Sequence, residues 1–320
     1  MHADTGTVLY EHNADDRMLI ASTTKIMTAI VVLENCALDD IVTIDERSAG
    51  AEGSSMYLRA GERYTVEDLL LGLMLVSGND AALALAIHTA GSVEDFAGMM
   101  NEKAAGLGMT GTHFSNPHGL DAEDHYSTAR DMAALAAYCM ENDDFALTNH
   151  NRLLSLYDGC IGIKTGYTMA AGRTLVSCAE RGNTRFICVT LCDRDDWDDH
   201  AALYDWAFEN YEYVRVIDSS VTYRVNAVNA EETLYASASA QRDGWALLPV
   251  GAECDTRVEL PPFVICPVQA GETAGQVVVS SNGQKVCSVR LVYAEDLPAR
   301  ESGGFLGSIE RFIRNLARPI

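Results

Sequence analysis

The feature of this sequence that most constrains its fold is a change of hydrophobic pattern along the chain. Residues 25–34 form a nearly continuous apolar run, long enough for a buried helix, and residues 127–140 carry another helical pattern. From residue 160 the pattern changes to short β-rich runs separated by turns, followed by a helix at about 198–212. The segment 6–13 also predicts a short strand. Helices enclosed by strands favour an α+β domain, in which a helical cluster packs on an antiparallel sheet.

Two capping patterns predict where further helices begin. Thr65 with Asp68, and Ser92 with Asp95, each have the spacing of a capping box ahead of an apolar run. Each pair therefore predicts a helix start.

After about residue 214 the helical pattern stops. The segments that follow alternate and turn often, and Asn282-Gly283 is a strong hairpin signal. We therefore expect a mixed domain over residues 1–213, a small all-β domain over 214–297, and a linker with a terminal helix over 298–320.

The terminal segment 305–320 has one apolar helical face with basic residues largely outside it. The face consists of Phe305, Leu306, Ile309, Phe312, Ile313 and Leu316, and the basic residues are Arg311, Arg314 and Arg318. A basic amphipathic helix suits an anionic membrane surface, but it could equally pack on its own protein.

Composition excludes several classes of function. The net charge of −23 argues against a nucleic-acid partner, because phosphate backbones are bound by clusters of Lys and Arg. No apolar run is long enough for a membrane-spanning helix, and the N-terminus lacks a signal-peptide pattern. The nine cysteines have no spacing suited to zinc, so buried free thiols are expected rather than disulfides or a metal site. We expect neither a metal nor a cofactor.

A serine and a lysine stand three positions apart where the run 25–34 begins. A serine hydroxyl is a weak nucleophile and needs a base within hydrogen-bond reach. If Ser22 begins the helix, Lys25 lies one turn later on the same face, and burial would lower its pKa enough to make the amine neutral. Alone, the pair is equally typical of an ordinary helix N-cap.

Two further motifs could complete such a site. Ser77 and Asn79 flank a glycine between two predicted helices, where the hydroxyl can relay a proton and the amide can bind a substrate amide. Alone, this is also typical of an interhelix loop. Lys164 and Thr165 on an exposed strand edge can bind a carboxylate, and Gly166 lets a substrate backbone approach closely.

Together, Ser-x-x-Lys, Ser-x-Asn and Lys-Thr-Gly stand in the order that marks penicillin-binding proteins and serine β-lactamases. Nearly the whole chain resembles the low-molecular-mass D-alanyl-D-alanine carboxypeptidases of the penicillin-binding protein 5 type, serine peptidase family S11. The resemblance implies a β-lactamase/transpeptidase-like fold, a family C-terminal domain at about 218–296, and a membrane anchor at 305–320. It also implies peptidoglycan stem peptides as substrates, β-lactams as inhibitors, and an extracytoplasmic location, peripheral on the outer face of the cytoplasmic membrane.

The resemblance further implies roles for the motif residues. Ser22 would attack the carbonyl of the penultimate D-Ala and form an acyl-enzyme, with Lys25 as general base. Ser77 would pass a proton to the leaving D-Ala, and water would then hydrolyse the acyl-enzyme. The remaining motif residues would orient the substrate, hold its carboxylate and, with the backbone N–H groups of Ser22 and Tyr167, form an oxyanion hole. The expected site residues are Ser22, Lys25, Ser77, Asn79, Lys164, Thr165, Gly166 and Tyr167.

The chain departs from the family in three places. Met1 falls inside the family's first strand, so the chain looks N-terminally incomplete. Only a short segment, 141–148, precedes Asn149, where relatives have a longer β-rich insert. Arg194 and His200 both fall where relatives place a carboxylate-binding arginine, and the sequence does not choose between them.

Three alternatives share the motifs. A class A β-lactamase needs a Glu-x-x-Leu-Asn pattern after Ser-x-Asn, and residues 80–163 contain none. A DD-transpeptidase could use the same acyl-enzyme with an amine acceptor in place of water. A non-catalytic peptidoglycan-binding protein could use the same groove, although all three motifs are intact.

Overall fold

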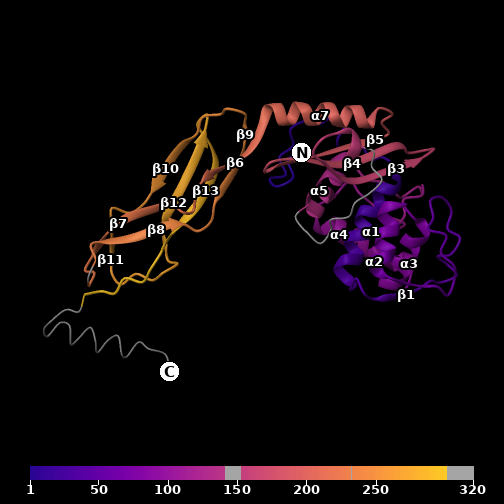
Figure 1. The fold of residues 1–320 in the computed structure, drawn as a ribbon, viewed down its shortest axis with the longest axis horizontal. Helices are drawn as coiled ribbons and strands as arrows, with labels where there is room; N and C mark the ends of the chain where they lie inside the picture. The colour runs from indigo at the N-terminus through magenta and orange to yellow at the C-terminus, as the bar shows by residue number, and fades with distance from the viewer. Residues whose placement is uncertain (141–152, 232, 301–320) are drawn as a thin grey trace, which may run out of the picture. The chain divides into compact units, whose positions relative to one another are not determined.

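The computed structural model describes residues 1–140, 153–231 and 233–300. The chain divides into two compact units, Met1–Asn210 and Tyr211–Ile320, and each is described by itself (Figure 1). The predicted terminal helix at 305–320 and the short segment 141–148 lie outside the described residues.

The first unit contains a cluster of helices that begins with a short 3₁₀ turn, η1 (Ala21–Thr24), running directly into α1. The helices are α1 (Lys25–Asn35), α2 (Val66–Leu75), α3 (Asn79–Ala90), α4 (Val93–Gly106), α5 (Ala129–Met140), α6 (Leu153–Leu156) and α7 (Asp196–Asn210). Eight of the eleven residues of α1 are buried, which confirms the helix predicted from the apolar run 25–34.

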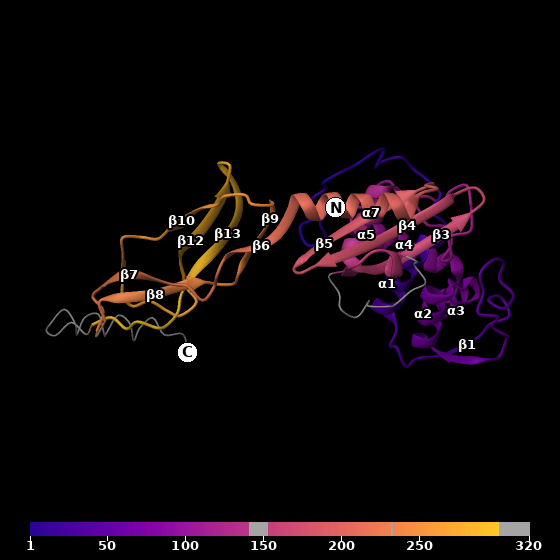
Figure 2. The same ribbon diagram turned by 45° about the horizontal axis from the view of Figure 1, so that its top comes forward.

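An antiparallel sheet of three strands completes this unit. Its order is β3 (Cys160–Thr168), β4 (Gly172–Arg181) and β5 (Thr184–Leu191), so β3 is an edge strand. Side chains alternate between the two faces of β4. Val176 and Cys178 join the core formed with the helical cluster, whereas Ser177 contacts α7 on the other face. Figure 2 shows α7 and α1 on opposite faces of the sheet. A separate two-stranded sheet pairs β1 (Ile41–Thr43) with β2 (Arg63–Thr65).

The two predicted capping patterns begin helices. Thr65 and Asp68 form the reciprocal capping box at the start of α2. At the start of α4, Ser92 Oγ accepts from Asp95 N at 3.0 Å, but the aspartate binds the serine hydroxyl in place of the backbone N–H. The second pattern therefore gives a cap without the full box.

The predicted strand at residues 6–13 is wrong. These residues form no strand, because a strand needs a partner and the nearby edge of β5 is bonded to the residues before them. Ala3 N donates to Arg185 O at 2.9 Å, and Ile187 N donates to Met1 O at 2.8 Å.

The described residues of the second unit, 211–231 and 233–300, form only β-strands and connecting segments, as the predicted fold class expects. Its main sheet has the order β10-β12-β13-β8-β7-β11, in which only β7 and β11 are parallel, and β6 pairs separately with β9. Asn282 and Gly283 both have positive φ at the tight turn from β12 to β13, which confirms the hairpin signal. The strands are β6 (Tyr211–Ile217), β7 (Thr222–Val228), β8 (Tyr235–Ala240), β9 (Gly244–Pro249), β10 (Asp255–Glu259), β11 (Phe263–Ile265), β12 (Thr273–Ser281) and β13 (Gln284–Tyr293).

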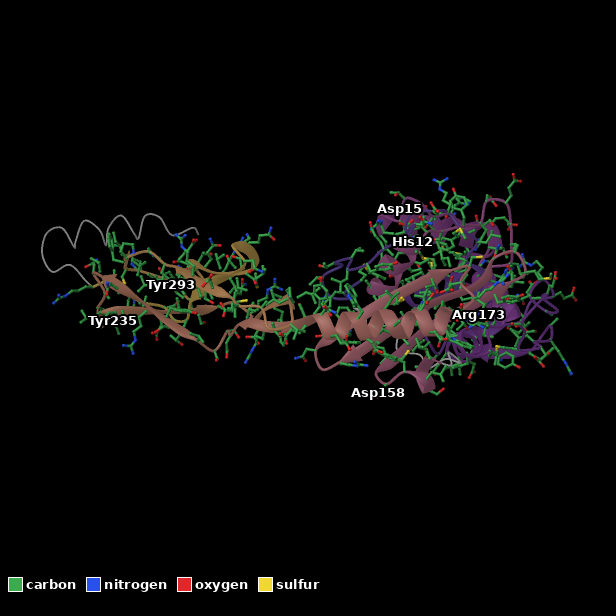
Figure 3. All side chains as sticks on the ribbon, turned by 90° about the horizontal axis from the view of Figure 1, so that it is seen from above. His12, Asp15, Asp158, Arg173, Tyr235 and Tyr293 are labelled. Carbon is green, nitrogen blue, oxygen red and sulfur yellow. The ribbon has the colours of Figure 1, made fainter. Side chains whose placement is uncertain are left out.

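This unit has its own hydrophobic core, in which Val277, Val279 and Leu291 are buried together with Tyr293. Tyr293 and the half-exposed Tyr235 are labelled in Figure 3. Among the described residues of the whole chain, no helix combines the length and apolarity that crossing a membrane requires.

Candidate active site

Ser22 lies at the head of the buried helix, as predicted, but it is not a helix cap. It is the second residue of η1, and neither Ile20 nor Thr24, the N-cap residues of η1 and α1, caps with its side chain. Ala21, directly before it, has a φ of 46°, a backbone conformation that non-glycine residues rarely adopt. Strain of this kind is concentrated at functional sites. The Ser22 hydroxyl is therefore free of a capping role.

The amine of Lys25 is the centre of the site. Its side chain is fully buried, and Nζ lies 3.0 Å from Ser22 Oγ, 2.7 Å from Asn79 Oδ1 and 2.7 Å from the carbonyl oxygen of His118. Burial, together with the positive charge of nearby Lys164, lowers the pKa of Lys25 well below its ordinary value. The shift favours the neutral form of the amine.

The three partners of Lys25 also fix the direction of its lone pair. A neutral amine has two N–H donors and one lone pair. Asn79 Oδ1 and the His118 carbonyl oxygen can only accept hydrogen bonds, so they take the two N–H groups. The lone pair then faces Ser22 Oγ, which is the geometry for removing the hydroxyl proton.

Asn79 is itself held in one orientation. It is the first residue of α3, and its Nδ2 donates to the carbonyl oxygen of Glu52 at 2.6 Å. Because the amide nitrogen is used there, the amide oxygen must point toward Lys25. The motif that looked like an interhelix loop in the sequence therefore contacts the predicted base directly.

Asp80 is a supporting residue that the sequence analysis missed. Its buried carboxylate accepts from Ser55 Oγ at 2.6 Å and from the backbone N–H groups of Met56 and Leu58 at 2.9 and 3.0 Å. Burial alone would raise its pKa, but these hydrogen bonds outweigh burial and lower it. The charged carboxylate thus ties residues 55–58 to the start of α3, beside Asn79.

The loop at 115–120 supplies the remaining support, and the sequence analysis assigned it no part in the site. Thr28 Oγ1 donates to the Pro117 carbonyl oxygen at 2.6 Å, next to the His118 carbonyl that binds Lys25. Gly119 has a φ of +88°, and a Cβ there would lie 1.9 Å from the Ala21 carbonyl oxygen. Only glycine lets this loop approach η1 so closely.

His125 joins this loop to the turn that carries Ser22. Its Nδ1 accepts from Ser115 N at 3.1 Å, so Nε2 carries the proton and donates to Thr24 Oγ1 at 2.8 Å. Burial lowers the pKa of His125 to about 4, which keeps it neutral. His125 therefore has a structural role at the edge of the site.

Strand β3 brings the third motif to Ser22. Lys164 pairs with Val176 and Gly166 with Thr174, so both lie on the sheet face that packs on the helices. A Cβ on Gly166 would lie 2.8 Å from Ser22 N and 2.4 Å from Thr174 Oγ1. The glycine is thus needed for the close approach of β3 to η1, in addition to the predicted approach of a substrate backbone.

Lys164 is almost fully buried, and its Nζ donates to the Thr165 carbonyl oxygen at 2.8 Å. Burial lowers the pKa of Lys164 to about 8. It is therefore a cation at neutral pH, close enough to Lys25 to affect that residue's pKa. Tyr167, paired with Arg173, is exposed near the end of this edge strand.

Ser77 lies two residues before Asn79 in a conformation that is unusual for serine, with a φ of 59°. Its Oγ is enclosed, yet it has no hydrogen-bond partner among the described residues. An enclosed hydroxyl without a partner is costly and is typical of a group that a ligand completes.

Of Arg194 and His200, the structure excludes His200 as the carboxylate-binding residue. His200 is fully buried on the α7 side of the sheet, where Ser177 Oγ and Thr190 Oγ1 lie 2.6 and 3.1 Å from its ring nitrogens, and burial lowers its pKa to about 3. It is a neutral core residue on the face opposite Ser22. Arg194 is exposed.

Two other features lie apart from these motifs. Arg173, labelled in Figure 3, binds the buried carboxylate of Asp196 at 2.6 Å and stacks on Trp197. A cavity of about 630 Å³ lies between β5, α5, α7 and the segment 8–14, and it is lined by none of the eight predicted site residues. This cavity is therefore separate from the predicted site.

Comparison with known proteins gives concordant findings. A family model described as D-alanyl-D-alanine carboxypeptidase matches residues 1–145 and 137–195. D-alanyl-D-alanine carboxypeptidase DacF of Bacillus subtilis is 32% identical over 338 residues, covering 96% of this chain and 86% of the relative. D-alanyl-D-alanine carboxypeptidase DacC of Escherichia coli is 34% identical over 343 residues, covering 97% and 85%.

Solved structures agree. The crystal structure of penicillin binding protein 5 from Haemophilus influenzae superposes with a TM-score of 0.74 at 30% identity, covering 93% of this chain and 96% of that one. A D-alanyl-D-alanine carboxypeptidase from Mycobacterium tuberculosis is 36% identical with a TM-score of 0.61, and covers 65% of this chain. The likeness thus extends to both sequence and fold.

Proposed function

The chain belongs to the D-alanyl-D-alanine carboxypeptidase family of serine peptidases, and from that premise we propose that Ser22, Lys25 and Ser77 carry its catalysis. The protein is a D-Ala-D-Ala carboxypeptidase that acts on peptidoglycan stem peptides outside the cytoplasm and binds β-lactams. The observation that carries the assignment of residues is the buried amine of Lys25, whose pKa is lowered well below its ordinary value and whose Nζ lies 3.0 Å from Ser22 Oγ.

Acylation begins when the Ser22 hydroxyl gives its proton to Lys25 and Oγ attacks the carbonyl carbon of the penultimate D-Ala. The backbone N–H of Ser22 stands at the head of η1, where the first N–H groups have no partner within the helix. Together with the N–H of Tyr167 it stabilises the developing oxyanion. The new bond is an ester between Ser22 and the substrate acyl group.

The C–N bond to the terminal D-Ala then breaks, and its nitrogen must gain a proton. We assign this delivery to Ser77, because its enclosed hydroxyl lacks a partner until substrate arrives and it adjoins Asn79, a partner of Lys25. The proton passes from Lys25 through Ser77 to the amine of the departing D-alanine. Water then hydrolyses the ester and restores Ser22.

The substrate is positioned by β3 and Asn79. Lys164 remains charged at neutral pH and, with Thr165, binds the terminal carboxylate. Among the described residues β3 is an edge strand of its sheet, so an extended peptide can add there as a further strand. Gly166 keeps β3 close to Ser22, which brings the scissile carbonyl within reach of Oγ.

The role of Lys164 in binding the substrate carboxylate is tested by measuring D-alanine release from diacetyl-Lys-D-Ala-D-Ala as a function of pH. Lys164 is cationic below its folded pKa of about 8 and neutral above it. We therefore expect KM to rise by about tenfold per pH unit above pH 8, while kcat changes less, because the lost charge acts on carboxylate binding. Pretreatment with penicillin should abolish release. A KM that stays constant from pH 7 to 10 would remove Lys164 from carboxylate binding.

We further propose that residues 305–320, which lie outside the described residues, hold the protein on the outer face of the cytoplasmic membrane. Support comes from the apolar face and three arginines of this segment, and from the anchor of the family it resembles. Deleting residues 303–320 should abolish cosedimentation with liposomes that contain anionic lipid, while penicillin labelling persists. Undiminished cosedimentation of the shortened protein would refute the anchor.

A further inference from the structure

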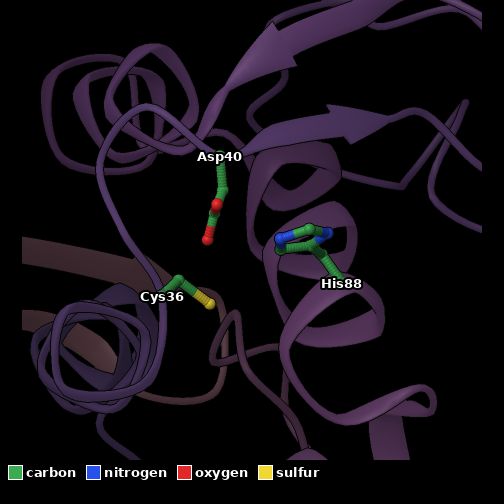
Figure 4. A group of neighbouring side chains, drawn as sticks. All are labelled: Cys36, Asp40 and His88. Atoms are coloured by element: carbon green, nitrogen blue, oxygen red, sulfur yellow. The ribbon is translucent and has the colours of Figure 1, made fainter.

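We propose that Cys36, Asp40 and His88 form a binding site for one Zn²⁺ ion or a similar borderline divalent metal ion. The thiol sulfur, one carboxylate oxygen and one imidazole nitrogen all lie within 4.8 Å of one another. Figure 4 shows the three side chains converging on a common space, Cys36 and Asp40 from the segment after α1 and His88 from α3. The site is distinct from the catalytic residues and beyond the carboxypeptidase activity.

Each ligand is held by secondary structure or by its own hydrogen bonds. Cys36 directly follows α1, and its N–H donates to the Val32 carbonyl oxygen. His88 lies in the last turn of α3. Asp40 Oδ2 accepts from Ala37 N at 2.9 Å, which leaves the other carboxylate oxygen for a ligand. Only small side-chain rotations are then needed to close a coordination sphere.

The backbone of the loop between these elements is also fixed. The Asp40 carbonyl oxygen accepts from Val66 N at 3.0 Å, and the Leu38 carbonyl oxygen accepts from Glu67 N at 3.0 Å. Both bonds go to the first turn of α2. The loop that carries Asp40 is therefore anchored to a third helix, which limits how far the carboxylate can move from Cys36 and His88.

The donor set selects the class of metal. Sulfur and imidazole nitrogen favour Zn²⁺ and related ions, whereas Ca²⁺ and Mg²⁺ require oxygen ligands. A thiolate and a carboxylate bring two negative charges to balance a divalent ion, and the partial exposure of the site leaves room for water as a fourth ligand. Three protein ligands with one open position is a recognised zinc arrangement.

Metal binding must release the thiol proton. Cys36 Sγ lies 3.3 Å from Thr89 Oγ1, and Thr89 Oγ1 donates its own proton to the Leu85 carbonyl oxygen. In the metal-free protein the thiol therefore donates to Thr89. On binding, that proton leaves to solvent and the sulfur turns to the metal.

The sequence did not predict a metal site, because the three ligands do not lie at a spacing typical of zinc sites. Cys36 and Asp40 are neighbours at the end of α1, but His88 stands on α3 and is brought to them only by helix packing. The metal would join the C-terminal ends of α1 and α3. These two helices carry Lys25 and Asn79 at their opposite ends.

The test uses Co²⁺ and Zn²⁺ alone, added to the full chain after removal of metal with EDTA. One equivalent of Co²⁺ should produce a saturable thiolate-to-metal charge-transfer band in the near ultraviolet, and Zn²⁺ should displace it. Cys36→Ser should lose the band. His88→Gln and Asp40→Asn should each weaken binding by tenfold or more, about the loss typical of a perturbed metal site.

Cys254→Ser is the matched control, because Cys254 is an exposed thiol in the other unit, and it should bind Co²⁺ like the unsubstituted chain. Fluorescent penicillin labelling shows whether each variant is folded. Because His88 is exposed, its replacement provides a second variant that does not depend on Cys36. Saturating Zn²⁺ should raise the Tm of the unsubstituted chain but not that of His88→Gln. A band that survives in Cys36→Ser, or equal Tm increases in both proteins, would overturn the proposal.

Discussion

Ser22→Ala is expected to form no covalent adduct with fluorescent penicillin and to release D-alanine about 10⁴-fold or more slowly than the unsubstituted chain. The expectation follows from the nature of the nucleophile: without Oγ no ester can form, and Lys25 has no hydroxyl to deprotonate. Loss of a catalytic serine in serine peptidases has effects of this order or larger. Binding contacts to the substrate would remain, so the loss should fall on kcat more than on KM.

The measurement is a gel assay of penicillin labelling, together with D-alanine release from diacetyl-Lys-D-Ala-D-Ala. Ser288→Ala, at an exposed serine of the second unit, is the control and should label normally. Circular dichroism should show that Ser22→Ala is folded, because a half-buried hydroxyl is lost without a change in packing volume. Covalent labelling of folded Ser22→Ala would exclude Ser22 as the nucleophile.

Lys25→Met is expected to lower the rate of acylation by about 10²- to 10⁴-fold, the usual contribution of a general base. Methionine keeps the unbranched shape of the buried chain but cannot accept the Ser22 proton. It also leaves Asn79 Oδ1 and the His118 carbonyl oxygen without their present donor. We therefore also expect a lower free energy of unfolding, by about 1–3 kcal/mol for each unpaired group at most.

Lys25→Arg separates these two effects. A guanidinium can donate to both oxygens but is not deprotonated at any working pH, so it can restore hydrogen bonds without restoring the base. Stopped-flow acylation by a chromogenic β-lactam measures the rate, and urea unfolding measures stability. Acylation by Lys25→Arg at a rate near that of the unsubstituted chain would show that another group removes the proton.

Much of the spatial arrangement of the predicted site residues could be predicted from the sequence, because it follows from three short motifs. A serine and a lysine three apart on a helix start must lie on one face, and alternation along β3 puts Lys164 and Gly166 on one face of the sheet. The apolar run after Ser22 also predicted the burial that lowers the pKa of Lys25. These arguments need only local geometry.

The features of the site that could not be predicted depend on backbone segments that are distant in the sequence. The His118 carbonyl oxygen that binds Lys25 has no sequence signal, since every residue has a carbonyl. Asp80 stood beside a recognised motif, yet its role depends on where residues 55–58 pass. The predicted strand at 6–13 was wrong for a related reason. The residue pattern indicates a preference for extended backbone, but a strand forms only where the edge of a neighbouring strand is free to pair with it.

The cysteines show the same limit. Cys178, Cys188 and Cys266 are buried as expected, but Cys192 and Cys254 are exposed and the others are half-buried. Apolar neighbours in sequence therefore did not ensure burial in space.

The contacts of the Lys25 amine also make the site depend on the folding of several segments. It contacts Ser22 from one segment, Asn79 from a second and the His118 carbonyl from a third, so four nitrogen and oxygen atoms from distant parts of the chain must converge before the base is set. On the proposed assignment of Ser22 as nucleophile, a molecule in which any one of these segments is detached should not react. We therefore expect penicillin labelling to measure the fraction of natively folded molecules. In a partly denatured population the labelling should fall in proportion to the folded fraction, because each molecule is either fully reactive or unreactive.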